Sequence, residues 1–421
     1  MQQYAYLLKE YGYQLPIMQK ILNDREHKEF QEKSKALYQR YKAEEDGVPI
    51  LRRKLFDFPF VTRNVYRVDD KVKNCINRNF EADIVDTKVG YFAGIPVTKS
   101  VAGESNFENI MTEWDKGGQS ADKDASLVKM ASITGIGYRL LYADKDGNAH
   151  VVNLDHTVED IFILTTSDYS SPDFAIRKYD DVVFDGSDVK TRTLIEFYDE
   201  KMIRTFEYDG KLTLIHERLH FFNGCPLFAV TNNDELQGDF EKVIPAIDAY
   251  NRTLSDASDE IESNRLAYLV LKGMQLDEET AERVKTNSVF ETFDDDQDVK
   301  YLTKDVNDQM IENHLNRLEK NIYKDAKSVD FSDEKFAGNA SGVALKYKNQ
   351  GLENKVSAFE RKFDAMLRYQ YMLLNEFWAQ NEAYGVKAER DKYREIKFTY
   401  RRNLPEDLGE QAEVQQKLMG V

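Results

Sequence analysis

The sequence contains only two cysteines, Cys75 and Cys225, among its 421 residues. Two cysteines cannot build a disulfide framework or a four-cysteine zinc site, and this low number indicates a reducing compartment. Long hydrophobic runs are missing as well, because charged residues interrupt every apolar stretch before the ~20 residues that cross a bilayer. The first residues also lack the basic and apolar pattern of a secretory signal. We therefore expect no membrane partner.

Positive charge is in short supply. The chain carries 58 Lys and Arg against 75 Asp and Glu, which gives a net charge of −17 at pH 7. Proteins that coat nucleic acid neutralise its phosphates with basic side chains, so this balance argues against that class. It is compatible with a protein past which DNA must slide without sticking.

Proline is missing between Pro245 and Pro405, whereas seven prolines lie in the first 245 residues. Proline is excluded from helix interiors because it lacks an N–H and clashes with the preceding turn. The sequence therefore predicts a mixed, loop-rich first half and a second half of long helices. The length and the 41% hydrophobic content are enough for two or three lobes of ordinary domain size.

The first half is predicted to be an antiparallel α+β region. Asp144–Asn148 and Asp209-Gly210 are turn sequences between alternating apolar runs, which is typical of hairpins. We expect helices at about 15–45, 78–90 and 125–134, a hairpin of 136–143 with 150–154, and strands at 160–164, 175–179, 191–198, 202–208 and 212–218.

Apolar residues in the second half recur every three or four positions, which indicates helices. These seams comprise Val243, Ile247, Tyr250, Leu254, Ala257 and Ile261, then Ile311, Leu315, Leu318 and Ile322, and then Val356, Phe359, Phe363, Met366, Gln370, Leu373 and Phe377. Between the first two seams we expect a buried strand at 266–271, a short helix at 277–285, and strands at 289–293 and 299–302. A last strand is expected at 396–400.

Two candidate metal sites are weak. Asp144, Asp146, Asn148 and Asp155 have the spacing of a calcium loop, but Ala149 replaces the required glycine, so a hairpin turn is favoured. His216 and His220 would share a helix face, yet their surroundings indicate a strand on which they lie ~13 Å apart. We interpret them as two exposed strand histidines.

No residue pattern predicts catalysis or a cofactor. Gly135 and Gly137 lack the rest of a nucleotide-binding motif, so relief of crowding is favoured. The acidic run 294–298 could hold a cation, although such runs are usually solvated tips. No nucleophile and base stand in a recognisable constellation. A DNA-modifying enzyme or nuclease stays an alternative function for the chain, and it would need a metal-binding cluster.

The helix predicted between residues 239 and 262 carries seven acids against two bases. A single solvated helix could carry this charge. Repeated around a ring of subunits, the same face would form an acidic wall that repels DNA phosphates and lowers friction.

Five strings, in order, resemble the portal proteins of tailed bacteriophages, most closely those of long-tailed phages of Gram-positive bacteria. They begin with residues 84–97 (IVDTKVGYFAGIPV) and 130–138 (MASITGIGY). The others are 232–243 (NNDELQGDFEKV) leading into 247–251 (IDAYN), 341–347 (SGVALKY) with 360–363 (ERKF), and 398–405 (FTYRRNLP).

The resemblance implies the portal fold, in which an α+β wing carries a two-helix stem, a small α/β clip and a long spanning helix. Portal proteins also have a helical crown, which here would be truncated or minimal. The corresponding segments are 1–238 for the N-terminal segment and wing, 239–263 and 305–327 for the stem helices, 264–304 for the clip, 328–342 for the tunnel loop, 343–404 for the long wing helix and returning strand, and 405–421 for the start of the crown.

The implied function is a ring of about twelve subunits at one capsid vertex through which double-stranded DNA is packaged and ejected. The implied partners are the terminase large subunit, the head–tail adaptor, and the major capsid and scaffolding proteins, with assembly in the host cytoplasm and a final place in the virion. A portal is not an enzyme and needs no cofactor.

The resemblance also assigns candidate sites. The stem seam between subunits would use Val243, Ile247, Leu254, Ile261, Leu315 and Leu318. The clip would dock partners through Glu278, Glu282, Asp294, Asp295 and Asp296. The tunnel loop would meet DNA through Lys335, Asn339 and Ser341, with Lys346 and Lys348 just beyond it.

Overall fold

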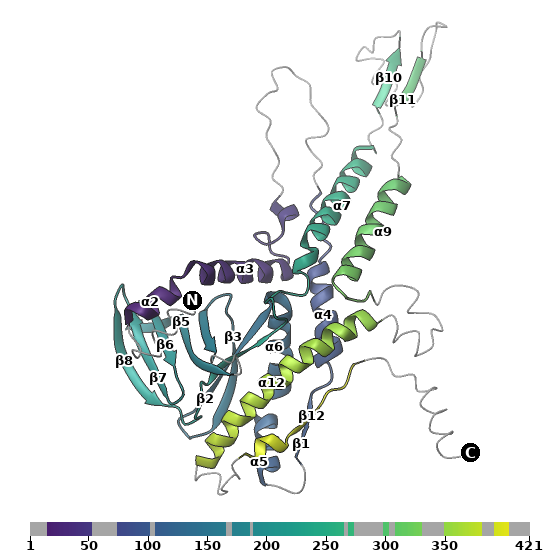
Figure 1. Ribbon diagram of the computed structural model, residues 1–421. Helices are drawn as coiled ribbons and strands as arrows, with labels where there is room; N and C mark the ends of the chain where they lie inside the picture. Colours follow the sequence, from purple (N-terminus) through teal and green to yellow (C-terminus); the bar gives the residue numbers. More distant parts are fainter. Residues whose placement is uncertain are drawn as a thin grey trace, which may run out of the picture. The chain divides into compact units, whose positions relative to one another are not determined.

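The computed structural model describes residues 15–52, 74–101, 106–165, 171–185, 188–264, 268–272, 298–302, 308–330, 349–380 and 391–403 (Figure 1). The chain forms two compact units, each built from separate stretches of sequence. The first comprises Met1–Val48, Asn79–Ile244 and Tyr323–Val421, and the second comprises Pro49–Arg78 and Pro245–Ile322.

The first unit contains a five-stranded antiparallel sheet in the order β4-β5-β6-β7-β8. Its strands are β4 (Asp160–Thr165), β5 (Pro172–Asp185), β6 (Asp188–Tyr198), β7 (Met202–Tyr208) and β8 (Leu212–Leu219). The sequence predicted all five, although β5 is much longer than expected. Gly210 has a φ of +96° in the turn before β8, a conformation that glycine adopts without strain.

A second sheet of three strands has the order β3-β2-β9. The predicted hairpin forms β2 (Ile136–Ala143) and β3 (Ala149–Leu154), while β9 (Leu227–Thr231) was not expected. Gly135 ends the preceding helix with a φ of +93°, and a Cβ on Gly137 would lie 2.8 Å from the Leu127 side chain. The interpretation as relief of crowding in a strand is confirmed for Gly137. Gly135 instead caps α6 just before the strand, where a Cβ would also lie 2.3 Å from the Leu236 carbonyl oxygen.

Both faces of the five-stranded sheet are covered over part of their area. One face packs on the three-stranded sheet in a core that contains Ile161, Ala175, Tyr198, Ile203, Ile136, Tyr138 and Leu140. The other face lies under α2 (Leu15–Leu22), which buries Met18 and Ile21 against it. Asp24 then caps α3 (Arg25–Tyr41) by accepting the Glu26 N–H, so the helix expected at 15–45 is broken there.

Helices fill the rest of the first unit around the longest one, α12 (Gln350–Gln380). The others are α4 (Phe80–Ala93), α5 (Asn106–Gly117) and α6 (Ser120–Thr134). All seven seam residues named above for 356–377 are buried. The strand expected at 396–400 is β12 (Lys397–Thr399), which pairs with β1 (Thr98–Ser100). Helix α5 and strand β1 were not expected.

The second unit contains α7 (Ile244–Asn264), α9 (Asp308–Asp325) and the antiparallel pair β10 (Tyr268–Lys272) and β11 (Asp298–Leu302). These strands match two of the strands expected around the clip. The helix expected at 277–285 and the strand expected at 289–293 lie outside the described residues. Short 3₁₀ turns occur at Pro49–Arg52, Glu241–Val243 and Lys392–Glu395. Among the helices that the structure describes, none combines the length and the apolar character of a membrane span.

His156 is buried in the first unit with an unusual lack of polar contacts. Its ring packs edge-on against Tyr138 at 5.0 Å, and within the described residues neither ring nitrogen has a hydrogen-bond partner. Burial lowers the pKa of His156 to about 4, although Asp155 opposes the shift. The folded protein therefore binds this proton less readily than the unfolded chain does.

Stability should consequently be complete above pH 6.5 and fall as the pH drops toward 4. Protonation of the His156 imidazole should lower the free energy of unfolding by about 3 kcal/mol at most. The free energy of unfolding, measured in urea, should therefore be lower at pH 5 than at pH 7. His156→Phe should remove the part of this difference that is due to the imidazole. His216→Phe, on the exposed strand β8, should keep the wild-type difference. An unchanged pH dependence in His156→Phe would contradict this account.

Candidate functional site

Helices α7 and α9 carry the predicted stem seams. On α7, Ile247 is buried, Leu254 is half-buried and Ile261 is 56% exposed. On α9, Leu315 and Leu318 are half-buried on the less exposed face. Val243, at the end of the 3₁₀ turn before α7, and Ile322 are buried. The apolar seams are thus only partly covered within one chain, and their role between subunits stays a prediction.

The two helices lie beside each other. A groove of about 670 Å³ is lined by Thr253 of α7 and by Met310, His314 and Arg317 among other residues of α9. Further along, burial and then the Glu319 carboxylate raise the pKa of Tyr250. The α7 side chains at 250 and 253 therefore face α9.

A different face of α7 is polar and binds an extended segment, residues 74–78. Asp259 Oδ1 accepts the Asn74 N–H at 2.6 Å, Ser255 Oγ accepts the Ile76 N–H at 3.0 Å, and Asn251 Oδ1 accepts the Arg78 N–H at 2.9 Å. Three helix residues spaced by four thus meet every second N–H of the extended segment. We call this arrangement the ladder. It satisfies backbone groups that would otherwise need water.

The middle rung of the ladder should be the most sensitive to substitution. Ser255 is fully buried and its hydroxyl also donates to the Asn251 carbonyl. Ser255→Ala leaves the Ile76 N–H without its acceptor, which is expected to cost about 1–2 kcal/mol of unfolding free energy and to speed amide exchange at Ile76. Ser258→Ala is the matched control, since that hydroxyl donates to the Leu254 carbonyl within α7. Equal exchange at Ile76 in both variants would argue against the ladder.

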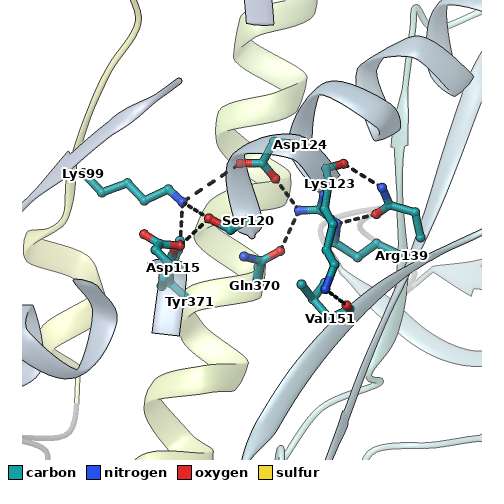
Figure 2. Close-up of polar contacts among 10 residues, drawn as sticks. Lys99, Asp115, Ser120, Lys123, Asp124, Arg139, Val151, Gln370 and Tyr371 are labelled. Carbon is teal, nitrogen blue, oxygen red and sulfur yellow. Dashed lines mark hydrogen bonds and ion pairs between the residues drawn. The ribbon is translucent and has the colours of Figure 1, made fainter. Parts of the chain in front are cut away.

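The first unit contains a buried polar network around Arg139 (Figure 2). Arg139 is 1% exposed on β2. Its Nη1 donates to Asp124 Oδ1 at 2.7 Å and to Gln370 Oε1 at 2.9 Å, and its Nε donates to Asn153 Oδ1 at 3.0 Å. One guanidinium therefore joins α6, α12 and β3 to β2.

Lys99 extends this network toward α5. Its Nζ donates to Asp115 Oδ1 at 2.8 Å and lies 4.0 Å from Asp124 Oδ2 (Figure 2). The Tyr371 hydroxyl donates to the same Asp115 oxygen at 2.8 Å, and Ser120 donates to it at 2.7 Å. Burial, with the Asp115 carboxylate, holds the pKa of Tyr371 well above its usual range. These contacts fix the register of α12 against β1 and α5.

A second buried cluster joins α4, α12 and the residues before α7. The Lys88 ammonium lies 3.0 Å from Asp239 Oδ2, and Lys355 lies 3.5 Å from Asp239 Oδ1. Lys88 also contacts the Asn232 amide oxygen and lies 4.3 Å from the centre of the Phe359 ring. Burial lowers the pKa of Lys88 to about 8, while for Asp239 the two lysines outweigh burial and hold the pKa at about 2.

The two candidate metal sites at Asp144–Asp155 and at His216 and His220 form ordinary structure, whereas residues 294–297 of the acidic run lie outside the described residues. Both oxygens of Asp144 are taken up within the hairpin turn, by the N–H groups of Asp146 and Asn148 and by the His150 ring. The interpretation of two exposed strand histidines is wrong for His220, which is 4% exposed and bonds the Asp199 carbonyl and the Phe222 N–H. Within the described ranges, no three His, Cys, Asp or Glu side chains gather as metal ligands would.

Two sets of predicted site residues cannot be placed. Lys335, Asn339, Ser341, Lys346 and Lys348 of the tunnel loop lie outside the described residues, as do Glu278, Glu282, Asp294, Asp295 and Asp296 of the clip. Sequence reasoning in turn missed both buried networks. The available signals were a lone arginine inside the apolar strand IGYRLLYA and a glutamine on the α12 seam.

Comparison with known proteins identifies the class as that of the phage portal proteins. A family model described as phage portal protein, SPP1 Gp6-like, matches residues 22–421, and the chain belongs to this family. Its architecture is the α+β portal fold.

Two curated relatives are portal proteins. One, from Clostridium phage phiCD119, is 24% identical over 381 residues, which cover 83% of this chain and 79% of the relative. The other, from Bacillus phage SPP1, is 25% identical over 338 residues, which cover 73% of this chain and 63% of the relative.

Among solved structures, similar chains occur in the virion of a native gene transfer agent particle and in the neck of an empty one. Both are 12% identical, both matches cover 81% of this chain and 85% of the other, and the TM-scores are 0.46 and 0.48.

Proposed function

We propose that the chain assembles into a ring channel at one capsid vertex, through which double-stranded phage DNA is packaged and ejected. The family match over residues 22–421 carries this proposal. The ring would be part of the virion, assembled in the host cytoplasm with capsid and scaffolding proteins. The wing, stem, clip, tunnel-loop and crown boundaries set out above belong to the same proposal, as does the absence of catalysis.

The stem seam supports ring formation. Leu254, Leu315 and Leu318 are half-buried and Ile261 is exposed, so apolar area is left over after α7 and α9 have met. Burying this area against neighbouring stems would stabilise the ring. The net charge of −17 fits a channel whose wall does not hold DNA.

The tunnel loop, residues 328–342, is proposed to line the narrowest part of the channel. Lys335 is its only cation, and Lys346 and Lys348 follow it. Few lysines suit a loop that touches DNA intermittently, because each fixed lysine–phosphate contact must be broken at every step.

Native mass measurement and DNA cross-linking test this function together. The purified chain should form rings of many subunits, and Asn339→Cys should cross-link to DNA trapped during packaging, whereas Asp209→Cys in the β7–β8 turn should not. A chain that stays monomeric and cleaves DNA with a metal ion would support the nuclease alternative. Rings with an unreactive Asn339→Cys would overturn only the loop assignment.

The clip is proposed to dock the terminase large subunit and, later, the head–tail adaptor. Its acids, from Glu278 to Asp296, would act mainly on the rate of encounter because exposed charges steer association. Reversing Asp294, Asp295 and Asp296 should slow adaptor binding in stopped flow and reduce its salt dependence. Unchanged rates would refute this docking surface.

A further inference from the structure

Strands β5 and β6 extend beyond the rest of their sheet. Their pairing continues to Asp185 and Asp188, whereas β4 pairs with β5 only as far as Lys178 and β7 pairs with β6 only from Thr193. Residues 179–185 of β5 therefore pair only with β6, over roughly 20 Å, and residues 188–192 of β6 pair only with β5. We call them the ribbon. An isolated two-stranded ribbon is at best marginally stable, so a ribbon of this length needs a surface to pack on.

One face of the ribbon is apolar and exposed. Phe184 lies opposite Val189 in the register, and Val182 is two residues before Phe184, so all three share a face. Their exposed fractions are 75%, 62% and 55%. By the same alternation this face continues that of Ile176, which is buried in the core under α2. The exposed apolar patch thus lies on the same side of the sheet as the core under α2 and is separated from it by Lys178, Asp180 and Thr193.

Strand β8 is a second unusual surface of the same sheet. It is the terminal strand, and its residues are exposed from Thr213 to Leu219. Leu214, Ile215 and Leu219 lie on this edge, and each is about half exposed. Edge strands are normally blunted against pairing, so a long edge with exposed leucines and isoleucine is suited to receive another β element.

The two surfaces are complementary in charge. The ribbon carries four acids, Asp180, Asp181, Asp185 and Asp188, against Lys190 and Arg192. The β8 edge and the turn before it carry Lys211 and Arg218 against Asp209 and Glu217. Glu217 is paired with Arg204 at 2.7 Å, and in the ribbon Asp181 is paired with Arg192 at 2.8 Å. With these pairs set aside, a small positive excess on the edge faces a negative excess on the ribbon. An acidic ribbon and a basic edge attract each other, and two ribbons or two edges do not.

The ribbon cannot reach the β8 edge of its own chain. It continues β5 and β6 in fixed register, and β7 lies between β6 and β8, so the open edge of β8 faces away from it. A contact between two different surfaces of identical chains is heterologous and generates a ring when the rotation closes.

We propose that in the assembled ring the ribbon of one subunit docks its apolar face on the β8 edge of the neighbouring subunit. The contact would be a second ring interface, built by the sheet and separate from the stem seam. It rests on the proposed function, since it requires a ring. It also gives the exposed Phe184 and Leu219 a defined partner.

Mixed cross-linking tests the contact. In a Cys75→Ser background, one preparation carries Phe184→Cys and another carries Leu219→Cys or Leu214→Cys, so that a disulfide between the engineered positions can form only between chains. After co-assembly and mild oxidation, the mixed rings should yield at least tenfold more covalent dimer than rings that combine Phe184→Cys with Val158→Cys. Val158 is 81% exposed in the turn before β4 and is the matched control.

Charge substitution gives an independent readout. Phe184→Asp and Leu219→Lys should each lower the ring fraction about tenfold with an unchanged melting temperature of the single chain, and the two combined should regain much of it. Wild-type rings that form without mixed cross-links above the control would overturn the ribbon contact and leave the portal function standing. A wild-type chain that forms no ring would overturn both.

Discussion

Replacing Arg139 with leucine is expected to lower the free energy of unfolding of the first unit by about 3–5 kcal/mol. The guanidinium bonds Asp124, Gln370 and Asn153, and its removal leaves the Asp124 carboxylate buried with Lys99 4.0 Å away. A buried carboxylate without its partner lowers the free energy of unfolding far more than the loss of the Arg139–Asp124 attraction alone would. Urea unfolding monitored by the fluorescence of Trp114 and Trp378 should report it, since both side chains belong to this core.

The chain contains its own control for this experiment. Arg192 pairs with Asp181 at 2.8 Å, but both side chains are more than a third exposed. Arg192→Leu should therefore cost no more than about 1 kcal/mol. Adding Asp124→Asn to Arg139→Leu should recover part of the loss because it removes the unpaired charge. Equal costs for Arg139→Leu and Arg192→Leu would contradict a structural role for the network.

Placing aspartate at Ile261 should abolish or strongly reduce ring assembly while the single chain stays as stable as wild type. Ile261 is 56% exposed in the single chain, so the substitution should change monomer stability by no more than about 0.5 kcal/mol. If neighbouring stems cover this side chain in the ring, aspartate there would bury an unpaired charge at a cost of several kcal/mol per interface. Sizing chromatography with light scattering measures the ring fraction directly.

Val158→Asp is the matched control for Ile261→Asp, because it places the same charge at another exposed apolar residue. It should leave ring yield unchanged. Leu254→Asp should also prevent assembly, but Leu254 is already half-buried in the chain, so its monomer should be less stable too. Wild-type ring yield from Ile261→Asp would remove Ile261 from the subunit interface.

Local periodicity predicted most elements of the fold. The strands from β4 to β8 follow period-two alternation between turn sequences, and the long helix α12 follows an unbroken seam without proline. Helix α5 was missed because only Phe107 and Met111 form its buried stripe, which is too few to give a period. Strand β9 was missed because a short apolar run between turns is ambiguous.

The candidate site was predicted less well, for a physical reason. The ladder joins residues 74–78 to α7, and the Arg139 network joins β2 to α12 across 231 positions of sequence. Contacts of this range leave no periodic trace, because their spacing is set by tertiary packing. Polar residues at otherwise apolar positions, such as Gln370, are the only local sign of them.

The helix and the extended segment of the ladder have slightly different repeat lengths. Four residues of α-helix rise about 6.0 Å, whereas two residues of extended chain rise about 6.6–6.8 Å, so successive rungs drift apart by roughly 0.7 Å. Hydrogen bonds tolerate a spread of about 0.5 Å in length, which allows one rung on each side of a well-aligned middle rung. The three observed rungs are therefore close to the longest run that a straight helix and an extended segment can share.

This mismatch makes the ladder a register lock. Inserting one residue between Asn74 and Arg78 would turn an N–H away from α7 and break a rung on one side of the insertion, while inserting one residue into α7 would rotate its acceptors by about 100°. The segment could not restore the hydrogen bonds by sliding along α7. A shift of two residues in one direction would bring Phe80, the first residue of α4, opposite Asn251. A shift in the other direction would bring Arg78 opposite Ile247, whose side chain has no acceptor. The segment can therefore occupy one position along the helix.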